Sequence, residues 1–203
     1  MTYSGMCEDD IVWELFGKQP KHFLDIGAGG AEVLSNTRSL ADKGWSGTWV
    51  DASYRSVPDL LVRQKKYPAG QIQVVHAAVS TKYEVRKIWN PSDYLITTLS
   101  VPLQERGHER TGAEEFYMST IRVADVVAAC PGPYEFISLD IEGLSLDVMK
   151  DIDYAALGCT CLCIEFLRKE HLGVDEEPII RQYMETQGFR HYVTTQENVI
   201  MIK

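Results

Sequence analysis

Short continuous apolar runs recur along the chain, and the stretches between them carry apolar residues at helical spacing. A run of this kind suits a strand covered on both faces, and the helical stretches suit the layers that cover it. The runs that we interpret as strands are residues 22–26, 47–50, 72–75, 134–140, 159–164, 189–193 and 199–202, the last two forming a closing hairpin. Their alternation with helices predicts an α/β domain whose sheet is wound on both faces.

The first apolar run leads into a glycine-rich loop, in the stretch His22–Gly30. Gly27, Gly29 and Gly30 permit positive φ angles and a close approach of the backbone to a ligand. The next segment, Ala31–Lys43, is predicted to form a helix whose first amides point back at this loop. Strand, glycine loop and helix together predict a nucleotide-type binding site.

The glycine spacing separates two classes of nucleotide cofactor. A dinucleotide fingerprint counted from Gly27 requires a glycine where this chain has Glu32, so a carboxylate would face the pyrophosphate. NAD is therefore disfavoured as the cofactor, and an NAD-linked enzyme ranks third among the functions considered for this chain. S-adenosylmethionine suits the loop better, because it is cationic, carries no phosphate and is favoured by Asp25 and Glu32. Asp51, at the end of the second strand, can accept both ribose hydroxyls.

Polar side chains follow several of the predicted strands. In an open parallel sheet the ligand crevice lies at the carboxyl ends of the strands, so these side chains are expected to open onto one rim. They are Asp25, Asp51, His76, Asp140 and Glu165. The segment after His76 is rich in small residues, and an adenine ring is expected to lie there against Ala77 and Ala78.

The length of 203 residues predicts a single domain over residues 1–203. Residues 1–20 contain an amphipathic N-terminal helix, whereas residues 83–115 interrupt the alternation of strands and helices. This irregular segment is strongly charged and carries Gly107 and Gly112. We interpret it as an insertion or lid beside the site, although a plain solvated loop has the same pattern.

The net charge and the cysteine content limit which binding partners and which cellular compartment are expected. The formal net charge is −9, from 29 acidic and 20 basic residues, and would repel a nucleic acid backbone. No apolar run reaches the roughly 18 residues of a membrane helix, and the start of the chain lacks a signal-peptide pattern. Cys159, Cys161 and Cys163 alternate along one predicted strand and fit small core residues on one face better than a metal site. These features predict a cytoplasmic protein with neither nucleic acid nor membrane as a partner.

Four segments carry a recognisable pattern. They are Phe23–Ala28, the stretch from Leu34–Thr37 through Gly44–Gly47 to Asp51, Ala77–Ser80 and Ser138–Gly143. This pattern resembles the FkbM-type S-adenosylmethionine-dependent methyltransferases, and its most specific part is the Asp-Ile-Glu-Gly motif after a strand. The family usually has a glycine where this chain has Ala31, so the loop is expected to bend differently.

The resemblance implies one doubly wound, Rossmann-like sheet of seven strands in the order 3-2-1-4-5-7-6, with the last strand antiparallel. It also implies S-adenosylmethionine as the cofactor, S-adenosylhomocysteine as the product, and methyl transfer to a hydroxyl oxygen of a sugar or natural product. The residues expected at the cofactor are Asp25, Gly27, Ala28, Gly29, Asp51, His76, Ala77, Ala78 and Asp140.

Three carboxylates are candidates for the chemistry. Methyl transfer is an in-line displacement, so a base is needed only to take the hydroxyl proton. Asp140 is best placed to be that base, Glu142 can steer the acceptor or the cofactor's amino group, and Glu165 belongs on the acceptor side. Alternatively, Glu142 satisfies amides at a helix N-terminus, or the three carboxylates gather a divalent metal, which their loose spacing disfavours. His171 and His108 fit surface histidines better than acceptor-side groups.

Two other functions compete with methyl transfer to oxygen. Asn90–Tyr94 faintly resembles the Asn-Pro-Pro-Tyr signature of amino-group methylation in DNA, but it lacks the second proline and precedes the fourth strand. The other alternative is a cofactor-binding domain without catalysis, a scaffold or sensor, and the presence of Asp140 and Glu142 weighs against it. The acceptor is expected to be a small molecule or glycan, selected by residues 83–115 and 168–175.

Overall fold

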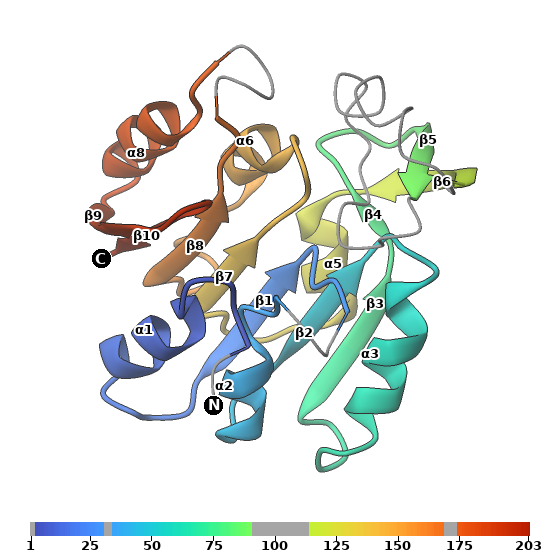
Figure 1. Ribbon diagram of the computed structural model, residues 1–203, viewed down its shortest axis with the longest axis horizontal. Helices are drawn as coiled ribbons and strands as arrows, with labels where there is room; N and C mark the ends of the chain where they lie inside the picture. Colours follow the sequence, from blue (N-terminus) through green and yellow to red (C-terminus); the bar gives the residue numbers. More distant parts are fainter. Residues whose placement is uncertain (1–2, 31–33, 91–113, 169–173) are drawn as a thin grey trace.

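Among the residues that the structure describes, seven strands form the central sheet (Figure 1). The computed structural model describes residues 3–30, 34–90, 114–168 and 174–203. The strands of this sheet are β1 (His22–Ile26), β2 (Ser46–Asp51), β3 (Ile72–His76), β7 (Phe136–Leu139), β8 (Cys161–Glu165), β9 (Arg190–Thr194) and β10 (Asn198–Ile202). Their order is β3-β2-β1-β7-β8-β10-β9, and β10 is antiparallel to both of its neighbours. Numbered within this sheet alone, the order is 3-2-1-4-5-7-6, which confirms the predicted fold class.

Helices cover both faces of the sheet (Figure 1). They are α1 (Glu8–Leu15), α2 (Arg38–Asp42), α3 (Ser56–Gln64), α5 (Val123–Ala129), α6 (Ser145–Val148) with the short η2 (Met149–Asp151), and α8 (Glu177–Thr186). The first three pack on one face, against Phe23, Trp49 and Phe136. The last three pack on the other face, against Leu24 and Ile137. Within the described ranges no helix has the length and apolar character needed to cross a membrane.

The buried cysteines divide between these two cores. Cys161 and Cys163 pack with the α1, α2 and α3 layer, whereas Cys159 packs in the core on the opposite face. The prediction of one shared face was therefore wrong for Cys159, because β8 begins only at Cys161. All three side chains are buried free thiols, as expected of small core residues.

A second, small sheet lies beside the carboxyl ends of β2 and β7. It consists of β4 (Ala78–Val79), β5 (Val85–Asn90) and β6 (Glu114–Ile121), in the order β4-β6-β5. Its apolar residues Ile88, Phe116 and Met118 pack with Ala52, which follows β2, and Leu144, which precedes α6. The predicted insertion at 83–115 thus contributes β5 and the first residues of β6 next to the rim, and its central part, residues 91–113, lies outside the described residues.

The helix after the glycine loop is shorter than the sequence predicted. The prediction placed it at Ala31–Lys43, but α2 is Arg38–Asp42, and residues 31–33 lie outside the described part. Leu34 has a left-handed φ of 55°, which is incompatible with a helix. The Ser35 hydroxyl oxygen then accepts the Arg38 amide at 3.1 Å, so it is Ser35 that satisfies the first turn. The first helical amide is therefore not directed at the glycine loop.

Candidate functional site

Gly27 is the point where the ends of β1 and β7 meet. The Asp140 amide donates to the Ile26 carbonyl at 2.9 Å, and Gly27 has a φ of +85°. A Cβ atom on Gly27 would lie 1.6 Å from the Asp140 carbonyl oxygen, far inside van der Waals contact. The close approach predicted for a ligand at Gly27 is therefore made by the protein's own backbone. This contact fixes the glycine loop relative to Asp140.

Asp51 holds the glycine loop over the end of β2. Its Oδ2 accepts the Gly29 amide at 2.8 Å, and its Oδ1 accepts the Ser53 amide at 2.7 Å. Burial raises the pKa of the Asp51 carboxyl, and these two amide bonds oppose that shift. Each carboxylate oxygen has a further lone pair, so Asp51 can also accept ribose hydroxyls in its predicted role.

The predicted adenine segment lies next to Asp51. The Ala77 amide donates to the Asp51 carbonyl at 3.0 Å, and His76 is exposed, with Nε2 3.2 Å from the Ala52 carbonyl oxygen. Ala78 is fully buried in β4, a strand of the small sheet, and Ala77 is buried in the main core. Of the three residues predicted at the adenine, only His76 is therefore exposed at the rim.

Asp25 does not open onto the rim as the sequence predicted. It lies one residue before the end of β1, and its side chain is only 2% exposed. Its Oδ2 accepts the hydroxyl of buried Thr37 at 2.6 Å. The prediction counted Asp25 among the strand-end residues, but its position within β1 turns the carboxylate into the core.

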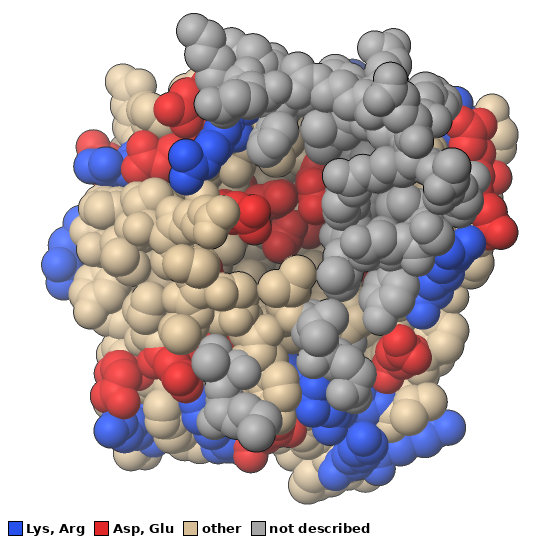
Figure 2. Space-filling view, in the orientation of Figure 1, with Lys and Arg blue, Asp and Glu red and all other residues tan. Residues whose placement is uncertain are grey.

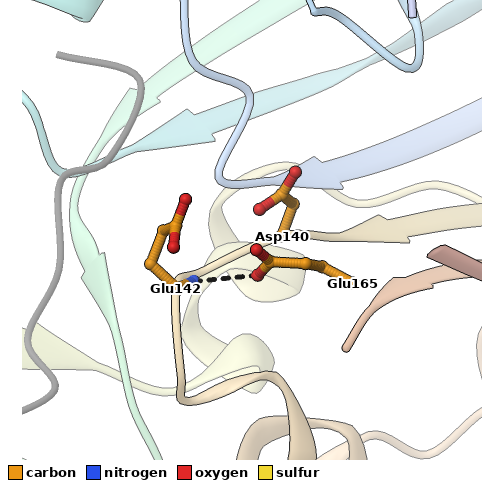
Figure 3. A group of neighbouring side chains, drawn as sticks. All are labelled: Asp140, Glu142 and Glu165. Atoms are coloured by element: carbon orange, nitrogen blue, oxygen red, sulfur yellow. Dashed lines mark hydrogen bonds between the residues drawn. The ribbon is translucent and has the colours of Figure 1, made fainter. Parts of the chain in front are cut away.

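Asp140, Glu142 and Glu165 come together at the rim (Figure 3). One oxygen from each carboxylate lies within 4.8 Å of the others, as the sequence-based assignment of these three residues requires. Glu142 and Gly143 form the turn after β7 with left-handed φ values of 50° and 91°. The Glu142 amide donates to Glu165 Oε2 at 3.1 Å, which ties this turn to the end of β8. Figure 3 shows the Glu142 carboxylate facing the other two.

The electrostatics of the two buried carboxyls favour a shared proton. Burial raises the pKa of Asp140 to about 6, with the charges of Glu197 and Asp51 adding to the shift. The pKa of Glu165 is raised well above its usual range by burial and by the charges of Asp140 and Glu142. The two side chains are hydrogen-bonded, so the pair holds a proton between them at a pH where two exposed carboxyls would both be ionised, with the larger rise in pKa at Glu165.

This carboxylate group has three chemical capacities. Figure 2 shows acidic side chains gathered in a hollow in the middle of the face of the molecule. Asp140 can accept a proton, and the group as a whole can hold an ammonium group or a hard divalent cation through oxygen ligands. Among the residues that the structure describes, this is the group whose spacing fits a metal ion.

The roles of several residues around the site could not be assigned from the sequence, although Thr37 and Ser138 lie in segments of the FkbM-like pattern. Ser53 supplies an amide to Asp51, Thr37 and Ser138 bond to Asp25, and Trp49 bonds to Thr37. Single hydroxyls and a tryptophan in core positions resemble ordinary packing residues, so only tertiary contacts identify them. The predicted surface histidines His171 and His108 lie outside the described residues.

Glu165→Gln is expected to stabilise the fold, increasingly so as the pH rises. The raised pKa means that folded Glu165 keeps a proton that the unfolded chain loses, so wild-type stability falls as the pH rises above the usual glutamate range. Glutamine removes this dependence and can still accept the Glu142 amide. The melting temperature should exceed that of wild type by about 3 °C near pH 8, the effect of roughly 1 kcal/mol in a chain of this size. The exposed Glu185→Gln on α8 is the matched control. A variant that is less stable at every pH would contradict the assignment.

Comparison with known proteins relates the chain to others through its fold. No protein-family model matches the sequence, and no curated protein matches it. A solved structure of magnesium protoporphyrin IX methyltransferase (ChlM) from Synechocystis PCC 6803 with bound SAM is similar, with a TM-score of 0.53 and 15% identity over 97% of this chain and 77% of that chain.

Two further structures show the same likeness. Monomeric WbdD gives a TM-score of 0.52 and 13% identity, covering 97% of this chain and 39% of its own. The METTL16 MTase domain gives a TM-score of 0.52 and 12% identity, covering 95% of this chain and 64% of its own. At identities this low, the likeness establishes that the chain has the fold of these proteins.

Proposed function

We propose that this protein is an S-adenosylmethionine-dependent methyltransferase. The observation that carries the proposal is the glycine loop at the end of β1, which is bonded to Asp51 and lies beside the carboxylates of Asp140, Glu142 and Glu165. This arrangement stands at the carboxyl ends of the central strands, where open α/β sheets bind their ligands. The similar ChlM structure contains bound SAM.

The residues fit this cofactor in chemical type. Asp51 accepts the ribose hydroxyls, and the surface around His76 receives the adenine. The backbone at Gly27, Ala28 and Gly29 lies along the rest of the cofactor. The acidic surroundings suit the sulfonium and ammonium charges, and when bound the cofactor supplies an electrophilic methyl group.

The acceptor in this proposal is a hydroxyl group on a sugar or natural-product-like small molecule. Asp140 accepts the hydroxyl proton, because the rise in pKa is smaller at Asp140 than at Glu165. Protonated Glu165 donates a hydrogen bond to Asp140 and orients it. Glu142 positions the acceptor, and the small sheet, with Ile88, Phe116 and Met118, lies beside this part of the rim. The FkbM-like motif at Ser138–Gly143 supports transfer to oxygen.

Asp140→Asn is expected to lower methyl transfer by about 100-fold or more, the usual contribution of a general base. The assay follows labelled methyl groups from S-adenosylmethionine onto a panel of sugars and polyketide hydroxyls. Affinity for S-adenosylhomocysteine should change little, since the amide keeps the shape of the side chain. The exposed Asp59→Asn on α3 is the control and should retain full activity. Equal activity of Asp140→Asn and wild type would remove the base assignment.

The same assay separates the alternatives. Binding of S-adenosylhomocysteine without turnover on any acceptor would favour a non-catalytic scaffold or sensor domain. A divalent metal at the carboxylate group is an alternative that we do not favour, although the spacing of the three carboxylates fits one. Proton acceptance by Asp140 needs no metal, so activity is expected to be the same with magnesium and with a chelator. Loss of activity in the chelator would assign the three carboxylates to a metal instead.

A further inference from the structure

A buried polar network links the central sheet to the segment before α2. Its members come from three adjacent strands and from the segment that leads into α2. They are Asp25 on β1, Trp49 on β2, Ser138 on β7, and Asn36 and Thr37 before α2. In the sheet register Asp25 pairs with both Trp49 and Ser138, so these three side chains share one face. All five residues are buried, so each polar group depends on the others for its partners.

The donors of the network all lead to Asp25. The Trp49 Nε1–H, which can only donate, reaches the Thr37 hydroxyl oxygen at 2.8 Å. Thr37 in turn donates its own proton to Asp25 Oδ2 at 2.6 Å. On the other side, Asn36 Nδ2 donates to the Ser138 hydroxyl at 3.2 Å, and Ser138 hydrogen-bonds to Asp25. A carboxylate at this position is the acceptor that both hydroxyls require.

We propose that Asp25 is a positioning residue, which holds Asn36 and Thr37 against the sheet and thereby sets the course of the glycine loop that binds the cofactor. The consequence for cofactor binding rests on the proposed function. Asp25 itself does not touch the cofactor, because its carboxylate is only 2% exposed and is used by Thr37 and Ser138. The restraint acts at both ends of the loop, since Asp25 lies two residues before Gly27 and Thr37 lies just before α2.

The network is expected to respond to pH. Burial raises the pKa of Asp25 to about 7; the bonds from Thr37 and Ser138 oppose this shift, and the nearby charges of Asp140 and Asp51 add to it. A protonated Asp25 brings a third hydroxyl donor into a group that already has two, so one donor loses its acceptor. The restraint on the loop therefore weakens as the pH falls through about 7.

Three variants test this role with two measurements. Asp25→Asn and Thr37→Val break the network, and Thr37→Ser keeps the hydroxyl as the matched control. Hydrogen–deuterium exchange of residues 34–42, without cofactor, reads the restraint directly. Titration with S-adenosylhomocysteine at about pH 6 and about pH 8 reads its effect on the loop. This ligand lacks the sulfonium charge but keeps an ammonium group, so Thr37→Val, which retains the Asp25 carboxyl, separates loop geometry from attraction to an anion.

Asp25→Asn and Thr37→Val are expected to raise exchange in residues 34–42 and to weaken binding by about tenfold, the loss of one buried hydrogen bond. Thr37→Ser should match wild type. Wild type should bind more tightly at the higher pH. Asp25→Asn should lose the part of this pH dependence that comes from the titration of Asp25.

Wild-type exchange in both disrupting variants, or an unchanged pH profile in Asp25→Asn, would overturn the positioning role. Failure of wild type to bind S-adenosylhomocysteine would contradict the proposed function instead, and the exchange measurement would still decide whether Asp25 restrains the loop.

Discussion

Gly27→Ala is expected to destabilise the fold by about 3 kcal/mol or more and to abolish binding of S-adenosylhomocysteine. The added methyl group would lie 1.6 Å from the Asp140 carbonyl oxygen, so the backbone at the ends of β1 and β7 must separate. The same movement displaces Asp140 from Glu165 and the glycine loop from Asp51. Chemical denaturation monitored by circular dichroism gives the stability, and calorimetric titration gives the binding.

Gly70→Ala is the matched control for this substitution. Gly70 has a φ of +82°, against +85° for Gly27, but a Cβ there would meet nothing within 4 Å. Its cost is therefore the backbone strain alone, about 1 kcal/mol, and binding should be unchanged. Equal effects of the two substitutions would show that the contact with Asp140 contributes nothing.

Asp51→Ala is expected to weaken binding of S-adenosylhomocysteine by about 100-fold or more. The change leaves the Gly29 and Ser53 amides without the carboxylate that accepts them at 2.8 and 2.7 Å. It also removes the acceptor proposed for the ribose hydroxyls, and a hydrogen bond to a charged group contributes about 1.5–3 kcal/mol. Titration calorimetry measures the loss.

The exposed Asp59→Ala on α3 removes the same charge without touching the loop and should bind like wild type. Melting curves of both variants establish that each is folded. Wild-type affinity in folded Asp51→Ala would contradict the placement of the cofactor over β2.

The strands and the carboxylate group followed from the sequence for a physical reason. Buried parallel strands are continuous apolar runs, so β1, β7 and β8 could be recognised without tertiary information. Because carboxyl ends of parallel strands meet at one edge, Asp140 and Glu165 could be expected together. The order of the strands was predicted from the FkbM resemblance, because hydrophobic periodicity alone does not specify strand order.

The details of the glycine loop could not be predicted, because they depend on contacts between distant residues. A glycine at position 27 indicates a close approach, but not that Asp140 makes it. Asp25 follows an apolar residue and precedes another, and only the strand register shows that its carboxylate faces Thr37 in the core. The predicted start of the helix after the loop, Ala31, was wrong, because the Ser35 hydroxyl accepts the first helical amide, that of Arg38. The pairing of β5 with β6 was not predicted, because the two strands are separated by a long intervening segment.

Calorimetric titration of the wild-type protein with S-adenosylhomocysteine, with NAD as the comparison ligand, shows which cofactor the glycine loop binds. The arrangement of Gly29, Asp51 and Asp140 predicts one molecule bound per chain with a micromolar dissociation constant, and no binding of NAD. Binding of NAD in place of S-adenosylhomocysteine, or of neither ligand, would contradict the assignment of this loop to S-adenosylmethionine and with it the proposed methyl transfer.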